Sequence, residues 1–231
     1  MIPEAHISPS HLSERMAAGK GVWCMLFFLI LSLTAIAQRE LLTNPSFEAG
    51  VADIFEKEFF TMKGWRDWGS HVMFPGNSPP DIHTSNTNWW SVKRQSQHGR
   101  SFVGLVTRPD GSFESLAQRL KEPLIAGLPY ILTIYVSQDS IYLSPWRLYG
   151  YQQINFVNPT VLRIWGSNTA GQMEELLAES QPVDHYEWRQ YVFQFIPKDR
   201  YKFLVISARS PAGETDKMTG HILIDNASLH K

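Results

Sequence analysis

Aromatic side chains gather in two stretches that are rich in Pro, Gly, Ser and Asn, residues 64–94 and 138–159. A flat ring can stack on the apolar C–H face of a pyranose, and planar polar groups can bind its hydroxyls. The rings that could stack in this way are Trp89, Trp90, Tyr142, Trp146 and Tyr149. The polar groups that could bind hydroxyls are Arg147, Asn86, Asn88, Gln152 and Gln153. The two stretches therefore predict a carbohydrate-binding surface built from long loops.

The same aromatic residues are compatible with two other arrangements. They could pack inside the protein as small clusters under the loops, which is what we expect for Trp65, or they could bury against a protein partner. The adjacent Trp89 and Trp90 cannot both point inward from an extended segment, because successive side chains point to opposite sides. One of the two is therefore expected to be exposed or covered by a loop.

Asp81 and His83 are the residues that could bind a metal ion through a local pattern. A carboxylate and an imidazole two positions apart lie on the same side of an extended segment. Two ligands do not make a metal site, so we expect a solvated loop at residues 81–83.

Known catalytic motifs do not occur: the sequence has no HExxH, GxSxG, GxGxxG or P-loop pattern. Glycoside hydrolysis has no local signature, because it needs only two carboxylates that face one cleft. The carboxylates that could serve are Asp110, Glu114, Asp139, Asp184 and Glu187. The sequence favours a protein that is not an enzyme, with a glycan-active hydrolase as an alternative.

The charged residues nearly cancel, with 21 Lys and Arg against 22 Asp and Glu, so the net charge is -1. No sequence-wide force therefore attracts the chain to nucleic acid or to an anionic membrane. Lys93, Arg94 and Arg100 form a small basic cluster, which we interpret as a solvated strand edge. The single Cys excludes an intramolecular disulfide and a Cys-based zinc site.

The N-terminal region is typical of a signal peptide. Residues 22–37 form an uncharged apolar run that follows Lys20 and ends in the small residues Ala35 and Ala37. The run is short for a membrane span, which needs about 20 residues. We expect residues 1–37 to be removed, with Met16 as an alternative start of translation. No transmembrane segment is predicted after this cleavage.

Residues 38–231 are expected to form a single all-β domain, an antiparallel β-sandwich. Short apolar or alternating runs are separated by Gly, Pro, Asn and Asp, and in 189–195 the residues Gln190 and Gln194 share the polar face. Only 173–180 has a pattern typical of a short helix. The predicted strands are 101–107, 114–120, 130–136, 161–165, 188–196, 201–207 and 221–229.

Several motifs resemble those of the galactose-binding-like jelly rolls that include many carbohydrate-binding modules. The residues TNPSFE at 43–48, with Gly64-Trp65 after them, resemble the opening strand of that family, and GHILIDNASL at 220–229 resembles its closing strand. The residues HGRSFVG at 98–104 and LKEPLIAGLPY at 120–130 are similar to segments between them. The resemblance implies a jelly-roll sandwich over nearly the whole of the chain after the signal peptide.

A further stretch, SPPDIH at 78–83, is similar to one in a variant of this family from secreted and outer-membrane proteins of Gram-negative bacteria. This similarity implies that the chain is secreted, periplasmic or on the outer surface of such a bacterium.

The resemblance also implies a structural calcium site, because the family often binds Ca²⁺ where its first and last strands meet. The matching carboxylates are Glu48 and Asp225, and backbone oxygens near Asn44 and near 98–100, Arg100 included, would complete the site. Calcium prefers about six to eight hard oxygen ligands. In the alternative, Glu48 and Asp225 cap turns or pair with Arg.

Together these patterns predict an exported, non-catalytic carbohydrate-binding module with a structural Ca²⁺ ion. The competing prediction is a structural or adhesion module of the cell envelope, in which the same aromatic residues bind a protein partner.

Overall fold

The computed structural model describes residues 39–48, 62–68, 79–85, 88–145, 150, 152–211 and 218–231. The predicted signal peptide, with Met16, lies outside the described residues, and so do Trp146, Arg147 and Tyr149 of the predicted loop surface. Within the described ranges, no helix has the length and apolar character needed to cross a membrane.

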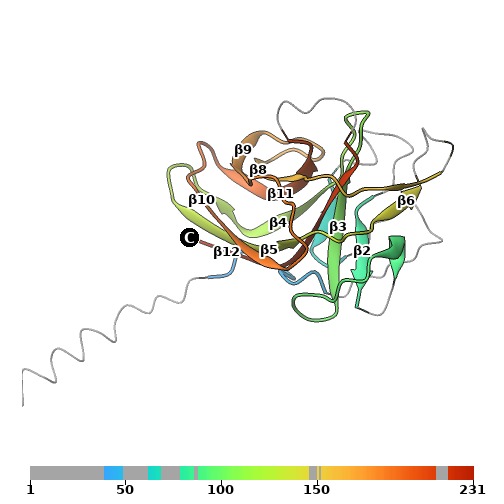
Figure 1. The fold of residues 1–231 in the computed structure, drawn as a ribbon. Helices are drawn as coiled ribbons and strands as arrows, with labels where there is room; N and C mark the ends of the chain where they lie inside the picture. The colour runs from blue at the N-terminus through green and yellow to red at the C-terminus, as the bar shows by residue number, and fades with distance from the viewer. Residues whose placement is uncertain are drawn as a thin grey trace, which may run out of the picture. The chain divides into compact units, whose positions relative to one another are not determined.

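The strands form two five-stranded sheets, and every pairing within them is antiparallel (Figure 1). The first sheet has the order β1-β4-β11-β8-β9, and the second has the order β10-β5-β12-β3-β2. The strands of the first sheet are β1 (Trp65–Asp67), β4 (Ser115–Leu124), β11 (Tyr201–Arg209), β8 (Val161–Ser167) and β9 (Glu175–Glu179). Those of the second are β10 (Arg189–Phe195), β5 (Tyr130–Ser137), β12 (Gly220–His230), β3 (Ser101–Thr107) and β2 (Asp81–Thr84).

Two smaller elements lie outside the two sheets. The strands β6 (Leu143–Pro145) and β7 (Gln153–Asn155) pair with each other, and η1 (Trp89–Ser91) is a single 3-10 turn. Trp90 and Ser91 in η1 both have positive φ, at 53° and 65°. Such backbone is costly for residues other than Gly, and it persists only where the surrounding structure imposes it.

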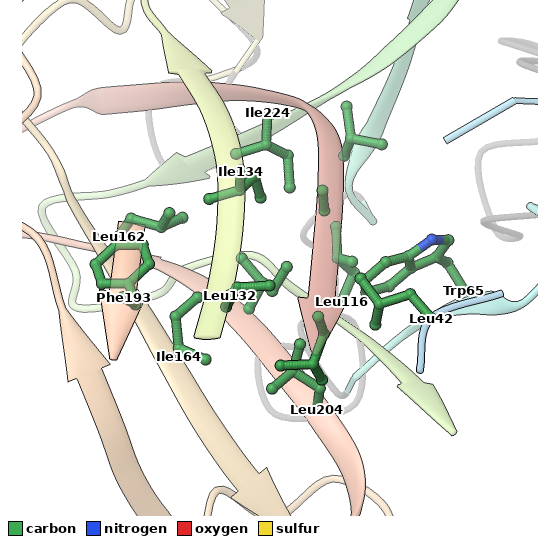
Figure 2. Close-up of a cluster of buried hydrophobic side chains, with 14 of the residues drawn as sticks. Leu42, Trp65, Leu116, Leu132, Ile134, Leu162, Ile164, Phe193, Leu204 and Ile224 are labelled. Carbon is green, nitrogen blue, oxygen red and sulfur yellow. The ribbon is translucent and has the colours of Figure 1, made fainter. Parts of the chain in front are cut away.

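The core lies between the two sheets and takes every second residue of the long strands. In β5, Leu132, Ile134 and Val136 are fully buried, whereas Ile131 is exposed. Figure 2 shows side chains of both sheets meeting in this layer, with Ile224 beside Ile134 and Leu162 beside Phe193. This alternation is what a sheet with one face on a core requires, and it confirms the predicted antiparallel β-sandwich of jelly-roll type.

All the strands predicted from alternation are present, with bounds shifted by a few residues. Trp65 is packed as expected, since it is 4% exposed and stacks on Phe47 with ring centroids 4.9 Å apart. The predicted helix at 173–180 is wrong, because this segment forms β9 and pairs with β8, Glu179 opposite Arg163. Its short apolar run can form either structure, and pairing with β8 decides the outcome.

Candidate functional site

The outer face of the second sheet is crossed by the segment 92–100, which connects η1 to β3. Its first residue, Val92, is buried in a cluster that includes outward residues of β3 and β12. The indole N–H of Trp188 donates to the backbone oxygen of Gln95 at 2.9 Å. Further along, Asp225 of β12 accepts hydrogen bonds from the segment. The segment therefore covers the β12-β3-β2 part of this face, while the outward residues of β10 remain exposed.

Under the covered part lies a cluster of polar and aromatic side chains. Asp81 accepts hydrogen bonds from the hydroxyl of Tyr142 and from the indole of Trp90. His83 stacks on Phe102 with ring centroids 5.1 Å apart, and the edge of the Tyr142 ring approaches it at 5.7 Å. His83 and Tyr142 are both 0% exposed. The expectation of a solvated loop at 81–83 is therefore wrong, because these residues form β2 and are enclosed by segments distant in the sequence.

A glycine makes this close packing possible. Gly104 of β3 lies opposite Asp81 in the register of the two strands. A Cβ atom at this position would lie 2.7 Å from Oη of Tyr142 and 2.8 Å from Nε2 of His83. Any larger residue would therefore push the two side chains off the sheet.

Burial keeps the two histidines of the cluster neutral. It lowers the pKa of His83 to about 3 and that of His221 to about 4, since desolvation disfavours the charged imidazole. The Nε2 atom of His221 accepts the backbone N–H of Asp139 at 2.8 Å, so its Nδ1 donates to the oxygen of Phe156. Both ring nitrogens of His83 lack a hydrogen-bond partner among the described residues.

A buried ion pair adjoins this cluster. Arg108 donates to Glu114 at 2.5 Å, and the two side chains are 4% and 0% exposed. Burial raises the pKa of Glu114 to about 8 against the opposing charge of Arg108, and burial also raises the pKa of Asp81. Glu114, which the sequence offers as a catalytic carboxylate, is thus enclosed, with no access for a substrate. The described residues include no group of three or more His, Cys, Asp or Glu that could hold a metal ion.

The predicted stacking residues do not share one environment. Tyr142 is buried in the cluster, so the expectation of an exposed ring there is not met. Trp90 is partly buried and packs against the same cluster, and Trp89 is also partly buried, with its Nε1 atom enclosed and without a hydrogen-bond partner in the described part of the chain. The structure therefore brings Trp90 and Tyr142 together around Asp81, as packing rather than as an open platform.

The open part of the face carries aromatic and amide groups that the sequence analysis did not select. Tyr135 of β5 pairs with Gln190 of β10, and Trp188 is two positions before Gln190, so Tyr135 and Trp188 hold diagonal positions on this face. Trp188 lies at the border of the covered part, where its ring meets that of Phe102 edge-on with centroids 5.7 Å apart. Both rings are partly exposed, and Gln190 and Gln194 are exposed. The alternation of Gln190 and Gln194 in β10 indicates this polar face from the sequence. The position of Tyr135 beside Gln190 depends on strand pairing, which the sequence pattern does not give.

The predicted calcium ligands Glu48 and Asp225 both contact the 92–100 segment. Oε1 of Glu48 accepts the backbone N–H groups of Arg100 at 2.8 Å and Ser101 at 3.1 Å. Asn44 holds Glu48 in place, because its Oδ1 accepts the backbone N–H of Glu48 at 2.8 Å. Oδ2 of Asp225 accepts two backbone N–H groups from the same 92–100 segment. The segment thus presents N–H groups to both carboxylates, which is the capping arrangement that the sequence left as the alternative.

The electrostatics of these carboxylates is also compatible with a cation. Burial raises the pKa of Asp225 to about 6, and the negative charge of Glu48 adds to this shift against three backbone hydrogen bonds. Among the described residues, no Lys or Arg side chain forms an ion pair with Glu48 or Asp225. Oε2 of Glu48 accepts no hydrogen bond from them either. Two carboxylates with an unused oxygen and nearby carbonyls are donors that suit Ca²⁺.

Comparison with known proteins gives structural likeness only. No protein-family model matches the sequence, and no curated protein matches it. The CBM22-1 xylan-binding domain of Xyn10C from Paenibacillus barcinonensis has 13% identity and a TM-score of 0.46, with 84% of this chain and 95% of that chain covered. A Family 16 carbohydrate-binding module has 12% identity and a TM-score of 0.42, with 83% and 99% covered.

A cleaved adhesin domain of Lys-gingipain from Porphyromonas gingivalis has 14% identity and a TM-score of 0.44, with 83% of this chain and 98% of that chain covered. Larger enzymes are matched over one part only. The chain spans 28% of a Clostridium thermocellum xylanase 10B chain that contains CBM22-1 and GH10 modules, and 26% of an α-L-arabinofuranosidase chain.

Proposed function

We propose that this chain is an exported, non-catalytic carbohydrate-binding module. The observation that carries the proposal is the diagonal placement of Tyr135 and Trp188 on the second sheet, where the open part of the face borders the covered part, with exposed Gln190 beside them. Two rings on a flat sheet face can stack on successive sugar rings, and a planar amide can bind hydroxyls between them. Because the polar groups here are uncharged amides, the proposed ligand is a neutral saccharide.

The loop residues extend the same proposal. Trp89 and Trp90 lie in the turn that precedes the 92–100 segment. Trp146, Arg147 and Tyr149 belong to the same predicted ligand surface and lie outside the described residues. We propose that the sheet face provides the platform of the site and that these loop residues also contribute to ligand binding.

We further propose that Glu48 and Asp225 hold a structural Ca²⁺ ion, with oxygens near Asn44 and Arg100. The ion would supply positive charge near two carboxylates that repel each other, and so would stabilise the junction of residues 39–48 with β12. Its role would be structural, since the sheet face and the carboxylates use different residues. The signal peptide and the motif resemblance support export in a Gram-negative bacterium.

One observation favours the second candidate, an envelope module that binds a protein. Val192 and Ile196, on and just after the edge strand β10, are 55% and 61% exposed. An edge strand with exposed apolar side chains is a surface on which a partner can pack or pair. A protein partner there would cover Val192, whereas a saccharide would need Tyr135 and Trp188.

The experiment is a glycan array on the chain from residue 38 to 231, followed by calorimetric titration of the sugars that bind. Trp188→Ala and Tyr135→Ala should each lower affinity about tenfold, the effect of losing about 1.4 kcal/mol. Trp165→Ala, on the opposite sheet, is the matched control and should bind normally. Thermal melts of each variant separate lost contacts from lost folding. If a folded chain binds no sugar on the array, the carbohydrate proposal is wrong and capture of envelope proteins becomes the next measurement.

A further inference from the structure

The outer face of the first sheet concentrates arginines in a chain whose charges otherwise cancel. In β8, Leu162 and Ile164 face the core, so Arg163 and Trp165 face outward. By the same alternation, β4 and β11 place Arg119, Phe203 and Arg209 outward, and β1 adds Arg66. Four guanidinium groups thus share this face with the rings of Trp68, Trp165 and Phe203, which pack with Ala117 and Val205 in a cluster on it.

The guanidinium group of Arg209 is contacted by uncharged side chains. Its Cζ atom lies 3.2 Å from the centroid of the Phe113 ring and 5.8 Å from that of Trp165. Its Nη2 atom lies 3.2 Å from Sδ of Met173, and Nε lies 3.5 Å from Oγ of Ser207. Within the described chain, no carboxylate forms an ion pair with this guanidinium.

A second guanidinium lies beside it. Arg163 pairs with Ser207 across the strands β8 and β11, two positions from Arg209. Burial lowers the pKa of Arg209 to about 10, and the charge of Arg163 adds to the shift. Glu179 pairs with Arg163 but not with Arg209. Two like charges are therefore held close together, an arrangement that a bound anion would stabilise.

The other end of the face repeats the combination of arginine and ring. The Cζ atom of Arg66 lies 5.7 Å from the centroid of Phe203, and Arg119 is the cross-strand partner of Phe203. Both arginines are exposed. Because neighbouring strands are about 4.8 Å apart, Arg66 on β1 and Arg163 on β8, three strands away, are about 14 Å apart across the sheet, with the buried cluster of Trp68, Ala117 and Val205 between them. A ligand that bridges them must be extended.

We propose that this face binds an acidic polysaccharide, a chain in which pyranose rings carry carboxylate or sulfate groups. Guanidinium forks match carboxylate and sulfate oxygens, and the half-exposed ring of Trp165 can stack on the apolar face of a sugar. Nucleic acid is a poorer match, because it carries about one charge per 1.7 Å and the chain as a whole has a net charge of -1. This site is separate from the neutral-sugar platform on the second sheet.

The test is binding of the 38–231 chain to oligogalacturonate and to heparin oligosaccharides at low and moderate salt. The native chain should bind at least one of them, more weakly as salt rises. Arg163→Gln with Arg209→Gln should weaken binding at least tenfold and reduce the salt dependence. Arg66→Gln with Arg119→Gln, exposed positions with little packing, should weaken it several-fold without lowering the melting temperature.

Matched controls decide the interpretation. Arg189→Gln, an exposed arginine paired with Glu187 on the second sheet, should bind normally. Trp188→Ala should also bind the acidic chains normally. Failure of the acidic-polysaccharide proposal can therefore be distinguished from failure of the neutral-sugar proposal. The inference is overturned if neither acidic oligosaccharide binds, if the arginine variants bind like the native chain, or if single-stranded DNA or phosphatidylglycerol vesicles bind more tightly.

Discussion

The carboxylate of Asp225 accepts the backbone N–H of His98 at 2.9 Å, although 127 positions separate the two residues. The same oxygen accepts the N–H of Gln97 at 2.8 Å. Asp225 therefore fastens the 92–100 segment to the last strand, next to Glu48, which caps the far end of that segment. The junction of residues 39–48 with the last strand, β12, is thus stabilised by two carboxylates and one connecting segment.

Chelation tests the proposed Ca²⁺ ion at this junction. A ligand present at about 100 times its Kd stabilises the native state by about 2.7 kcal/mol, which corresponds to about 5–10 °C in Tm for a domain of this size. Excess EDTA should lower the Tm of the native chain by that amount. Asp225→Asn keeps an oxygen to cap the segment but loses the charge, so its Tm should be lower and insensitive to EDTA. An identical Tm for the native chain in Ca²⁺ and in EDTA would show that the carboxylates act only as caps.

Gly99→Ala should destabilise the protein more than an ordinary substitution of glycine. Gly99 has φ of 65°, and a Cβ there would lie 2.2 Å from Oε1 of Glu48, which two backbone N–H groups hold in place. The strained backbone costs about 1–2 kcal/mol and the displaced cap adds about 1–3 kcal/mol. Urea unfolding measures the difference.

Gly171→Ala is the control for that substitution. Gly171 has φ of 75°, and no atom lies within 4 Å of the position that a Cβ would take there, so only the backbone cost of about 1–2 kcal/mol applies. Equal losses at the two positions would mean that Glu48 moves aside without cost, and the capping role would be wrong.

The two buried histidines should contribute a loss of stability as the pH falls below 6.5. The pKa values of His83 and His221 are about 3 and about 4 in the folded chain, and about 6.5 when unfolded. Between pH 6.5 and 4 the unfolded chain binds more protons, so the free energy of unfolding falls as the pH falls. Two protons give a slope of about 2.7 kcal/mol per pH unit, as an upper limit from these groups. Urea unfolding at several pH values measures it.

Two carboxyl groups act in the opposite sense, so the net dependence of stability on pH is smaller than that of the histidines alone, and the His83 contribution is measured by substitution. The raised pKa values of Asp225, about 6, and Glu114, about 8, stabilise the fold at low pH and lose that contribution as pH rises through them. His83→Phe, which removes one imidazole from an aromatic site, should lower the acid slope by about 1.4 kcal/mol per pH unit. An unchanged slope would show that His83 titrates normally and that its burial is not maintained.

The strands could be predicted where the evidence for them is local. In 189–195 the apolar residues recur at every second position. Successive side chains of a strand point to opposite faces, so this pattern alone predicts a half-buried strand. β2 could not be predicted, because Asp81 and His83 are polar and their burial requires β3 on one side and Tyr142 above. β9 could not be predicted either, because its five residues fit a helix equally well until they pair with β8.

Alternation along the sequence is enough to predict the long strands and the all-β class. The opening motif is expected to be a strand and is not one, although its residues do meet the last strand through the hydrogen bond from Ala227 to Pro45. Tertiary structure alone decided which side chains are neighbours across a sheet. Tyr135 is placed diagonal to Trp188, and Arg163 diagonal to Arg209, by strand register. Tyr142 is buried over Asp81 because distant segments cover that face. A strand's pattern depends on residues two positions apart, whereas these contacts join residues tens of positions apart, where no local pattern acts.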